Sequence, residues 1–463
     1  MSVESFISAL ASAMWGRPLM VVLLAAGVYL TLRLKFVQVR HFKHGWELIT
    51  GKFDDPSEQG DVTHFQALSA ALSATIGTGN IVGVATAIAS GGPGAVFWMW
   101  VTGFLGMVNK FASCALALKF RVIHEDGTAS GGPMYYLDRG LGMRWLAIMF
   151  AFCTMVACFG IGCMVQSNSA ADALYDTFRV PRPLTGVVMA GLVALVVFGG
   201  MRRIGQVTCR LTPAMCVIYV LGAIIVLVRN AHALPGVFAS IFVHAFTPTA
   251  AMGAFVGVTV RETIRYGVAR GLFSNEGGLG SAPIAHAAAK TSEPIREGLV
   301  AMLGPFVDTL IVCTMTALTI LSTGAWTMPG EGGAALTGAA LTNRAFDLAL
   351  PGLGRLVVTV GLVLFSFSTV LTWPYYGDRC AEYLFGRKAI PIYRAIHVVL
   401  LALGAAVELH LVWNVSDIMN GLMAFPNLIG IVGLSGLLAR ELDAYFRANK
   451  HKQPNVTRQR RSA

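Results

Sequence analysis

Long apolar segments separated by short polar connections run through the whole sequence and limit what the chain can fold into. Each approaches or exceeds the roughly 20 residues that a helix needs to cross the hydrocarbon core of a bilayer. Lipid offers no hydrogen-bond partners to the backbone, so we predict that these segments are helices. They lie at about residues 17–36, 64–90, 94–120, 145–175, 184–200, 211–229, 253–287, 298–322, 354–378, 389–411 and 413–438.

Composition supports an all-α integral membrane protein. The chain is 55% hydrophobic and 13% charged, whereas a soluble domain carries about 25% charged residues. A membrane β-barrel would need short alternating strands in place of these continuous runs. The eight cysteines lie in or beside the apolar segments without CxxC spacing, which is typical of small hydrophobic packing residues. The N-terminus lacks a basic region before its first apolar segment, and we predict a retained helix there.

The basic residues predict the orientation of the chain in the membrane. With the N-terminus outside, 24 of the 35 Lys and Arg residues fall in the inner loops and the C-terminal tail, and six fall outside. This asymmetry follows the positive-inside rule and places the C-terminus in the cytoplasm. The net charge of +11 is therefore attributed to orientation in a cell membrane and not to nucleic-acid binding.

The eleven predicted spans divide into one N-terminal helix and two halves of five spans each. An odd number of spans in each half gives the halves opposite topology, which is the pattern of inverted-repeat transporters. We predict an N-terminal helix with its cytoplasmic connection in residues 1–63 and a transporter core in residues 64–440. The core would comprise repeats at 64–229 and 253–438, and residues 441–463 would form a basic cytoplasmic tail.

The first span of each half contains a polar, glycine-rich interruption. The first interruption is Gly77-Thr78-Gly79-Asn80. If the helix unwinds here, freed carbonyls before the break suit a cation, and freed amides after it suit a carboxylate. Such breaks at corresponding positions of two halves indicate a binding site near the middle of the membrane. The alternative is close helix packing through small residues.

The second interruption is Ser274-Asn275-Glu276-Gly277-Gly278, preceded by Phe273. Asn275 offers both donors and an acceptor. Glu276 is an ionisable group at membrane depth, which is costly unless it is paired or hydrated. It is either a structural partner of freed amides or of a basic residue, or a group that couples transport to an ion. Phe273 is either a pocket wall or a packing residue.

Other polar residues within the spans add to the candidates. Gln166 begins a polar patch in the fourth span, and its amide either bonds a neighbouring helix or contacts a substrate. Ser366, Ser368 and Thr369 lie in the ninth span and are followed by Trp373; their hydroxyls can also bond their own helix. Asp308 and Lys110 are charged residues within spans that the sequence does not pair.

The sequence lacks enzyme signatures. It contains no GxSxG, HExxH or Walker A motif, and its ten histidines are scattered. A transporter is therefore favoured over a membrane enzyme. A channel would need a continuous polar pathway.

Three long stretches resemble one known family. GTGNIVGVATAIASGGPGAVFWMW, ASGGPMYYL and GLFSNEGGLGSAPIAHAAA, followed by GPFVDTLIVCT, are similar to the alanine or glycine:cation symporter family over about residues 64–440. The resemblance implies a LeuT-type fold with one additional N-terminal helix. It also implies sodium- or proton-coupled uptake of small neutral amino acids by alternating access. The chain departs from the expected pattern at Gly278, where alanine is expected, and at Leu279, where methionine is expected.

The resemblance also implies roles for individual residues. It assigns substrate binding to two groups of residues in the breaks and to two further pocket positions: Thr78, Gly79, Asn80, Phe273, Ser274, Asn275, Gln166 and Trp373. It implies a sodium site formed by carbonyls near Ala74 and Gly77 and the hydroxyls of Thr369 and Ser368. The residues themselves leave the choice of ion open, because hydroxyls and carbonyls suit sodium whereas Glu276 suits a proton.

Overall fold

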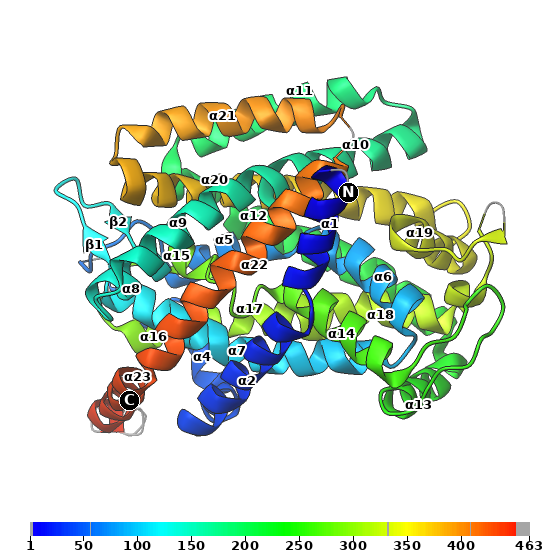
Figure 1. Cartoon of the computed structure of the whole chain (residues 1–463), viewed down its shortest axis with the longest axis horizontal. Helices are drawn as coiled ribbons and strands as arrows, with labels where there is room; N and C mark the ends of the chain where they lie inside the picture. Colours follow the sequence, from blue (N-terminus) through cyan, green and yellow to red (C-terminus); the bar gives the residue numbers. More distant parts are fainter. Residues whose placement is uncertain (1–2, 56, 331–332, 408, 451–463) are drawn as a thin grey trace, which may run out of the picture.

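Helices make up most of the protein in the computed structural model, which describes residues 3–55, 57–330, 333–407 and 409–450. The helices run mainly along one direction and form a bundle (Figure 1). One end of the bundle carries a short antiparallel hairpin of β1 (Val122–Ile123) and β2 (Ala129–Ser130). We call it the hairpin end.

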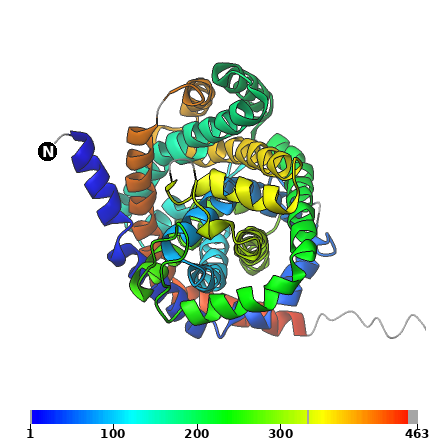
Figure 2. The same ribbon diagram turned by 90° about the vertical axis from the view of Figure 1, so that its right-hand side faces the viewer.

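The N-terminal region forms four helices outside the core. They are α1 (Val3–Met14), α2 (Arg17–Arg33), α3 (Val37–Arg40) and α4 (Phe42–Ile49). Pro18 in the first turn of α2 suits a helix start, because that position has no intrahelical N–H bond to lose. In the view of Figure 2, α1 lies at the outer edge of the bundle, and it packs against a helix near the other end of the chain, α22 (His410–Gly433).

The first half of the core begins with a broken helix and continues with four further spans. Its elements are α5 (His64–Thr75), η1 (Thr78–Asn80), α6 (Val82–Gly91), α7 (Ala95–Lys119), α9 (Arg144–Phe159), η2 (Gly160–Met164), α10 (Val165–Phe178), α11 (Arg182–Val197) and α12 (Gly200–Arg229). The short helix α8 (Pro133–Arg139) follows the hairpin. Segment η2 is a wider, π-helical stretch that joins α9 to α10.

The second half repeats this plan. Its elements are α14 (Val260–Asn275), α15 (Ala282–His286), α16 (Pro294–Ala301), α17 (Leu303–Pro305), η4 (Phe306–Cys313), α18 (Thr314–Ser322), α20 (Gly354–Phe385), α21 (Ala389–Gly404) and α22. Corresponding spans of the two halves pack together: α11 lies beside α21, and α9 and α10 lie beside α20 (Figure 1). The division of the core into repeats at 64–229 and 253–438 stays a prediction.

Several elements lie outside the predicted spans. They are η3 (Ala231–Ala233), α13 (Leu234–His244), η5 (Ala325–Thr327), α19 (Gly338–Ala349) and α23 (Ser435–Lys450). Helix α23 extends into the predicted tail, of which residues 451–463 lie outside the described residues. Residues 253–259, predicted to begin the second broken span, contain no helix, and this span starts at Val260.

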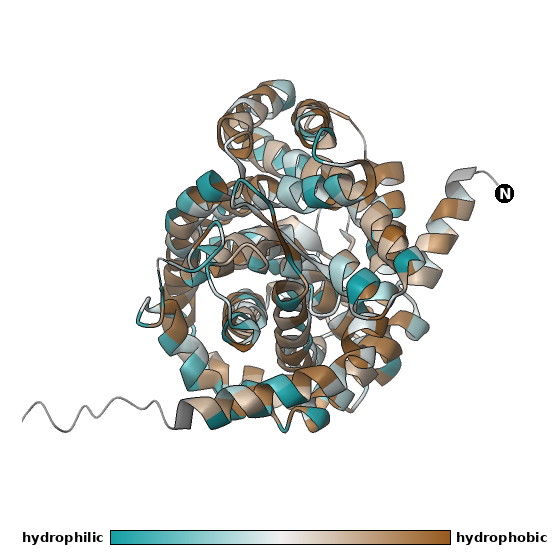
Figure 3. Ribbon diagram, turned by 90° about the vertical axis from the view of Figure 1, so that its left-hand side faces the viewer, coloured by the Kyte–Doolittle hydropathy of each residue, from teal (hydrophilic) through white to brown (hydrophobic). Residues whose placement is uncertain are grey.

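Each predicted apolar segment contains a described helix, but the count of eleven spans is not established. Seven helices of the described part are long and apolar enough to cross a membrane, or eight if the bent first span counts as one. Helices α11 and α21 are apolar but have 16 residues each. Their outer surfaces carry exposed Val187, Leu195, Val399 and Leu403. Hydrophobic residues lie on helices all around the bundle (Figure 3), as expected for side chains that face lipid.

Candidate functional site

The first interruption is a true break in a helix. Helix α5 ends at Thr75, and the axis bends by 63° before the chain continues into α6. Asn80 stabilises the break, because its Oδ1 accepts a hydrogen bond from the Gly77 N–H at 3.0 Å. Ala74, Thr78 and Asn80 are buried. The predicted first break is therefore confirmed, and it lies inside the protein.

The second interruption is also a break. Helix α14 ends at Asn275, and Glu276 adopts a left-handed conformation with φ of +53°. Asn275 Oδ1 accepts a hydrogen bond from the Gly277 N–H at 2.8 Å, and the Ser281 hydroxyl donates to the Glu276 carboxylate. Helix resumes at Ala282. The side chains of Ser274, Asn275 and Glu276 are buried.

The two breaks touch each other at Gly79. A Cβ atom added at Gly79 would lie 3.4 Å from both the Phe273 ring and the Ser274 Cα atom. A Cβ atom at this distance would be in ordinary van der Waals contact, so the backbone of the first break lies next to the second. Residues predicted separately from two distant motifs are adjacent in space, with Phe273 only half-buried.

Helix α20 lies against the opposite side of the first break. The Ser368 hydroxyl has three carbonyl oxygens within reach of its one hydrogen: that of Phe365 in its own helix at 2.9 Å, and those of Ser73 at 3.1 Å and Ile76 at 3.4 Å at the first break. A Cβ atom added at Gly77 would come within 2.8 Å of Thr369 Oγ1. Hydroxyls of α20 and carbonyls of the break are therefore brought together, which is the uncharged oxygen chemistry expected for a sodium site. Its occupation by an ion stays a prediction.

Trp373 provides another contact between α20 and the first break. Its Nε1–H donates to the Ala74 carbonyl oxygen at 3.2 Å, which occupies one acceptor position of a predicted sodium ligand. The indole also packs on Gly162 of η2, where an added Cβ atom would lie 2.3 Å from Trp373 Cγ. The wide π-helical segment thus accommodates a large aromatic side chain beside the site.

Gln166 reaches the first break from α10. Its Nε2 donates to the Ile161 carbonyl oxygen at 3.1 Å and lies 3.4 Å from Thr78 Oγ1. The rest of its polar patch bonds backbone carbonyl oxygens: Ser167 bonds that of Leu401, and Asn168 bonds those of Gly404 and Val407. Of this patch, Gln166 is the residue whose side chain contacts a break.

Two buried amide atoms at the site have no hydrogen-bond partner among the described residues. They are Gln166 Oε1, an acceptor, and Asn275 Nδ2, a donor. Leaving a buried polar atom unpaired costs about 1–3 kcal/mol, and such atoms in a folded protein call for an explanation.

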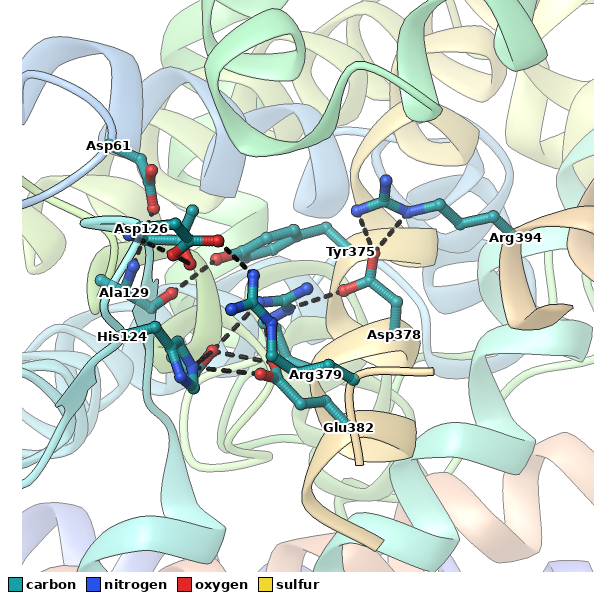
Figure 4. A network of polar contacts seen from close by, with 12 residues as sticks. Asp61, His124, Asp126, Ala129, Tyr375, Asp378, Arg379, Glu382 and Arg394 are labelled. Carbon is teal, nitrogen blue, oxygen red and sulfur yellow. Dashed lines mark hydrogen bonds and ion pairs between the residues drawn. The ribbon is translucent and has the colours of Figure 1, made fainter. Parts of the chain in front are cut away.

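The sequence did not reveal two features of this region. Asp308 of η4 contacts residues of both breaks, although no motif spacing links it to them. A polar network at the hairpin end joins segments from across the chain, with Arg379 of α20 at its centre (Figure 4). Arg379 contacts Asp378, Glu382 and Ser130 at distances between 2.8 and 3.0 Å.

The hairpin-end network connects the hairpin to the start of α5. The Ala129 N–H donates to Asp61 Oδ2 at 3.1 Å, and the Tyr375 hydroxyl donates to the Ala129 carbonyl oxygen at 3.4 Å (Figure 4). Burial raises the pKa of Asp61, whereas the Ala129 N–H and the Arg202 guanidinium act to lower it. Arg121 donates to the carbonyl oxygens of four residues that flank the two broken helices: Gln59, Ala287, Ala289 and Thr291. These contacts close this end of the bundle around the broken helices.

Comparisons with known proteins identify relatives over nearly the whole chain. A model of the sodium:alanine symporter family matches residues 1–459. An uncharacterized transporter of Haemophilus influenzae is 48% identical, covering 97% of this chain and 98% of the relative. The sodium/alanine symporter AgcS of Methanococcus maripaludis is 47% identical, covering 98% and 100%. A probable sodium/glutamine symporter of Bacillus subtilis, GlnT, is 37% identical, covering 94% and 89%.

Solved transporter structures share the fold at low sequence identity. A manganese transporter of Eremococcus coleocola aligns with a TM-score of 0.52 at 13% identity, covering 84% of this chain and 82% of that chain. MhsT in complex with L-phenylalanine aligns with a TM-score of 0.50 at 13% identity, covering 82% and 90%. These likenesses confirm the predicted LeuT-type fold.

Proposed function

This chain belongs to the sodium:alanine symporter family, and from that membership we propose that it takes up alanine and glycine together with sodium. Its relatives and structural neighbours are transporters and not enzymes. The observation that carries the choice of substrate class is the pair of unpartnered buried amide atoms, Gln166 Oε1 and Asn275 Nδ2, beside two helix breaks in contact. A small amino acid offers both donors and acceptors to such a site.

The proposed substrate lies between the two breaks. Amides freed near Thr78, Gly79 and Asn80 would bind its carboxylate, because they begin the second half of a broken helix. Ser274, Asn275 and Gln166 would supply polar contacts, whereas Phe273 and Trp373 would limit the length of its side chain. The proximity of the two breaks at Gly79 supports a small substrate.

The proposed sodium ion lies between the first break and α20. Carbonyl oxygens near Ala74 and Gly77 and the hydroxyls of Ser368 and Thr369 would replace its water. An ion there would hold the break against α20 in the shape that accepts substrate. The linkage is reciprocal, so sodium should raise the affinity for alanine by the same factor as alanine raises the affinity for sodium.

We place the protein in the cytoplasmic membrane with its N-terminus outside and its C-terminus in the cytoplasm. The support is the excess of Lys and Arg in the predicted inner loops. In this orientation the hairpin end faces the cytoplasm, because the segment between α7 and α8 is an inner loop. Substrate release by alternating access would then require the hairpin-end contacts to open.

Uptake into proteoliposomes tests the proposal. We expect saturable uptake of radiolabelled alanine and glycine that requires an inward sodium gradient, and no uptake of leucine. Uptake of glutamine without uptake of alanine or glycine would overturn the proposed substrate, and it is the outcome expected if this chain shares the activity named for the Bacillus subtilis relative GlnT.

Coupling to protons is the second candidate, and Glu276 is the observation that favours it. Its carboxyl group is buried within the second break and contacts the Ser281 hydroxyl, so it is placed to carry a proton through the site. The same vesicles separate the two ions. Uptake driven by a pH gradient and indifferent to sodium would replace sodium with a proton.

A further inference from the structure

Asp308 is a fully buried carboxylate that faces the two breaks from a third element, η4. Asn80 of the first break donates from Nδ2 to Asp308 Oδ1 at 2.6 Å. Ser274 of the second break donates from its hydroxyl to Asp308 Oδ2 at 2.9 Å. Asp308 thus bonds a residue from each broken helix, and the Cys313 thiol adds weaker contacts to the same two residues at 3.3 and 3.2 Å.

The carboxylate is held by neutral donors. The Thr309 hydroxyl supplies a third bond to Asp308 Oδ2 at 2.7 Å. The buried Lys110 attracts Asp308 electrostatically, but no nitrogen of Lys, Arg or His among the described residues lies within ion-pair distance of Asp308. Burying a carboxylate is costly unless hydrogen bonds compensate, and these three donors provide that compensation. Two of the three donors come from the breaks. Separating the breaks would therefore leave the buried carboxylate without these donors, which is energetically costly.

Asn80 fixes the need for an acceptor at this position. Its Oδ1 is already used by the Gly77 N–H, so Asn80 presents its Nδ2 donor to Asp308. The Ser274 and Thr309 hydroxyls donate to the other carboxylate oxygen, and a hydroxyl can also accept where a donor faces it. An apolar side chain of similar size at position 308 would leave the Asn80 and Ser274 donors without this partner.

We propose that Asp308 is a positioning residue of the transport site: its carboxylate holds Asn80 and Ser274, and with them the two helix breaks, together in the closed arrangement. The inference rests on the proposed function, in which Asn80 and Ser274 contact the substrate. Asp308 itself acts through these two residues. Loss of the tie therefore weakens substrate binding by letting the two halves of the site move apart.

Three variants test the tie by alanine uptake in proteoliposomes. Asp308→Leu should raise the KM for alanine roughly five- to 150-fold, because it removes the acceptor of Asn80 and Ser274. Thr309→Val is the matched control, because it removes one donor to the same carboxylate without touching either break. Its KM should stay within about twofold of the wild-type value, given that the tie to the breaks remains.

Asp308→Asn distinguishes the hydrogen bonds from a general need for a folded core. Its Oδ1 can accept from Asn80 Nδ2, and its Nδ2 can donate to the Ser274 and Thr309 hydroxyls, which then act as acceptors. Its KM for alanine should be at least tenfold lower than that of Asp308→Leu. If Asp308→Leu fails to fold, Asp308→Asn should still give a folded transporter.

Several results would overturn the proposal. They are an unchanged KM in Asp308→Leu, an equal rise in Thr309→Val, or an Asp308→Asn variant that is as impaired as Asp308→Leu or remains unfolded. Thermal unfolding of each purified variant separates loss of fold from loss of affinity. The wild-type protein tests the proposed function independently, because its own alanine uptake does not depend on the outcome for any Asp308 variant.

Discussion

Ser73 and Ser368 exchange hydrogen bonds across the contact between α5 and α20. The Ser73 hydroxyl donates to the Ser368 carbonyl oxygen at 2.6 Å, and the Ser368 hydroxyl donates to the Ser73 carbonyl oxygen at 3.1 Å. Both side chains are fully buried. This reciprocal pair fixes the last turn of α5, and therefore the first break, against the helix that carries Thr369.

Removing one hydroxyl of this pair should destabilise the protein. Ser73→Ala leaves the Ser368 carbonyl oxygen without this donor, and we expect a loss of about 1–3 kcal/mol. Ser366→Ala is the matched control, because the Ser366 hydroxyl is buried without a described partner. Thermal unfolding of both variants in one detergent measures the difference. Equal melting temperatures would show that the serine pair contributes nothing.

Thr369→Val should weaken sodium dependence while keeping the shape of the side chain. Thr369 Oγ1 faces Gly77 and is a proposed sodium ligand. We expect a higher sodium concentration for half-maximal alanine uptake and a smaller defect at saturating sodium. Thr359→Val makes the same change on the same helix, where the hydroxyl contacts Thr177 instead. A Thr369→Val protein with the sodium dependence of Thr359→Val would remove Thr369 from the site.

Gln166→Ala and Asn275→Ala should each raise the KM for alanine. Both amides present a buried atom with no partner among the described residues. Losing such a contact to substrate costs about 1–3 kcal/mol, or roughly five- to 150-fold in affinity. Asn168→Ala serves as the control, since its amide bonds the backbone of α21 and the segment after it. If either variant has the same KM as Asn168→Ala, the amide that it lacks contributes to helix packing and not to substrate binding.

Trp373 should set the upper size limit of the substrate. We expect wild-type protein to carry alanine and glycine and to reject leucine, because rejection must come from overlap with the pocket wall. Trp373→Phe removes part of that wall at lower risk to folding than alanine, and leucine uptake should appear. Trp326→Phe alters a buried indole that packs on Phe255, and it should leave selectivity unchanged. Leucine uptake by the wild type would contradict this interpretation.

Arg379→Met should strongly destabilise the hairpin end. The side chain is 7% exposed and pairs with Asp378 and Glu382. Removing one partner of a buried ion pair costs up to about 3–5 kcal/mol where the remaining charge is left unpaired. Asp378 keeps its pair with Arg394, so this cost falls on Glu382. Arg387→Met provides the comparison, since Arg387 is 49% exposed in its pair with Asp126 and such pairs contribute about 0–1 kcal/mol. Similar melting temperatures for the two variants would argue against a structural role for Arg379.

The sequence predicted the breaks more accurately than the spans. Glycine-rich polar motifs within apolar helices have few alternatives at membrane depth, so both breaks lie at the predicted residues. Span limits depend on small differences in apolar length, and the start of the second broken helix was placed seven residues too early. Helices α13 and α19 lie outside the predicted spans and were not predicted.

The sequence by itself determined that the chain is an α-helical membrane protein with two broken helices, because a bilayer leaves the backbone almost no other solution. It also identified candidate residues at the breaks through local chemistry. Only the tertiary structure decided which of them meet. Gly79 against Phe273, Ser368 against Ser73, and Asp308 against both Asn80 and Ser274 are contacts between segments far apart in the chain. Such contacts depend on how whole helices pack, and no local pattern encodes them.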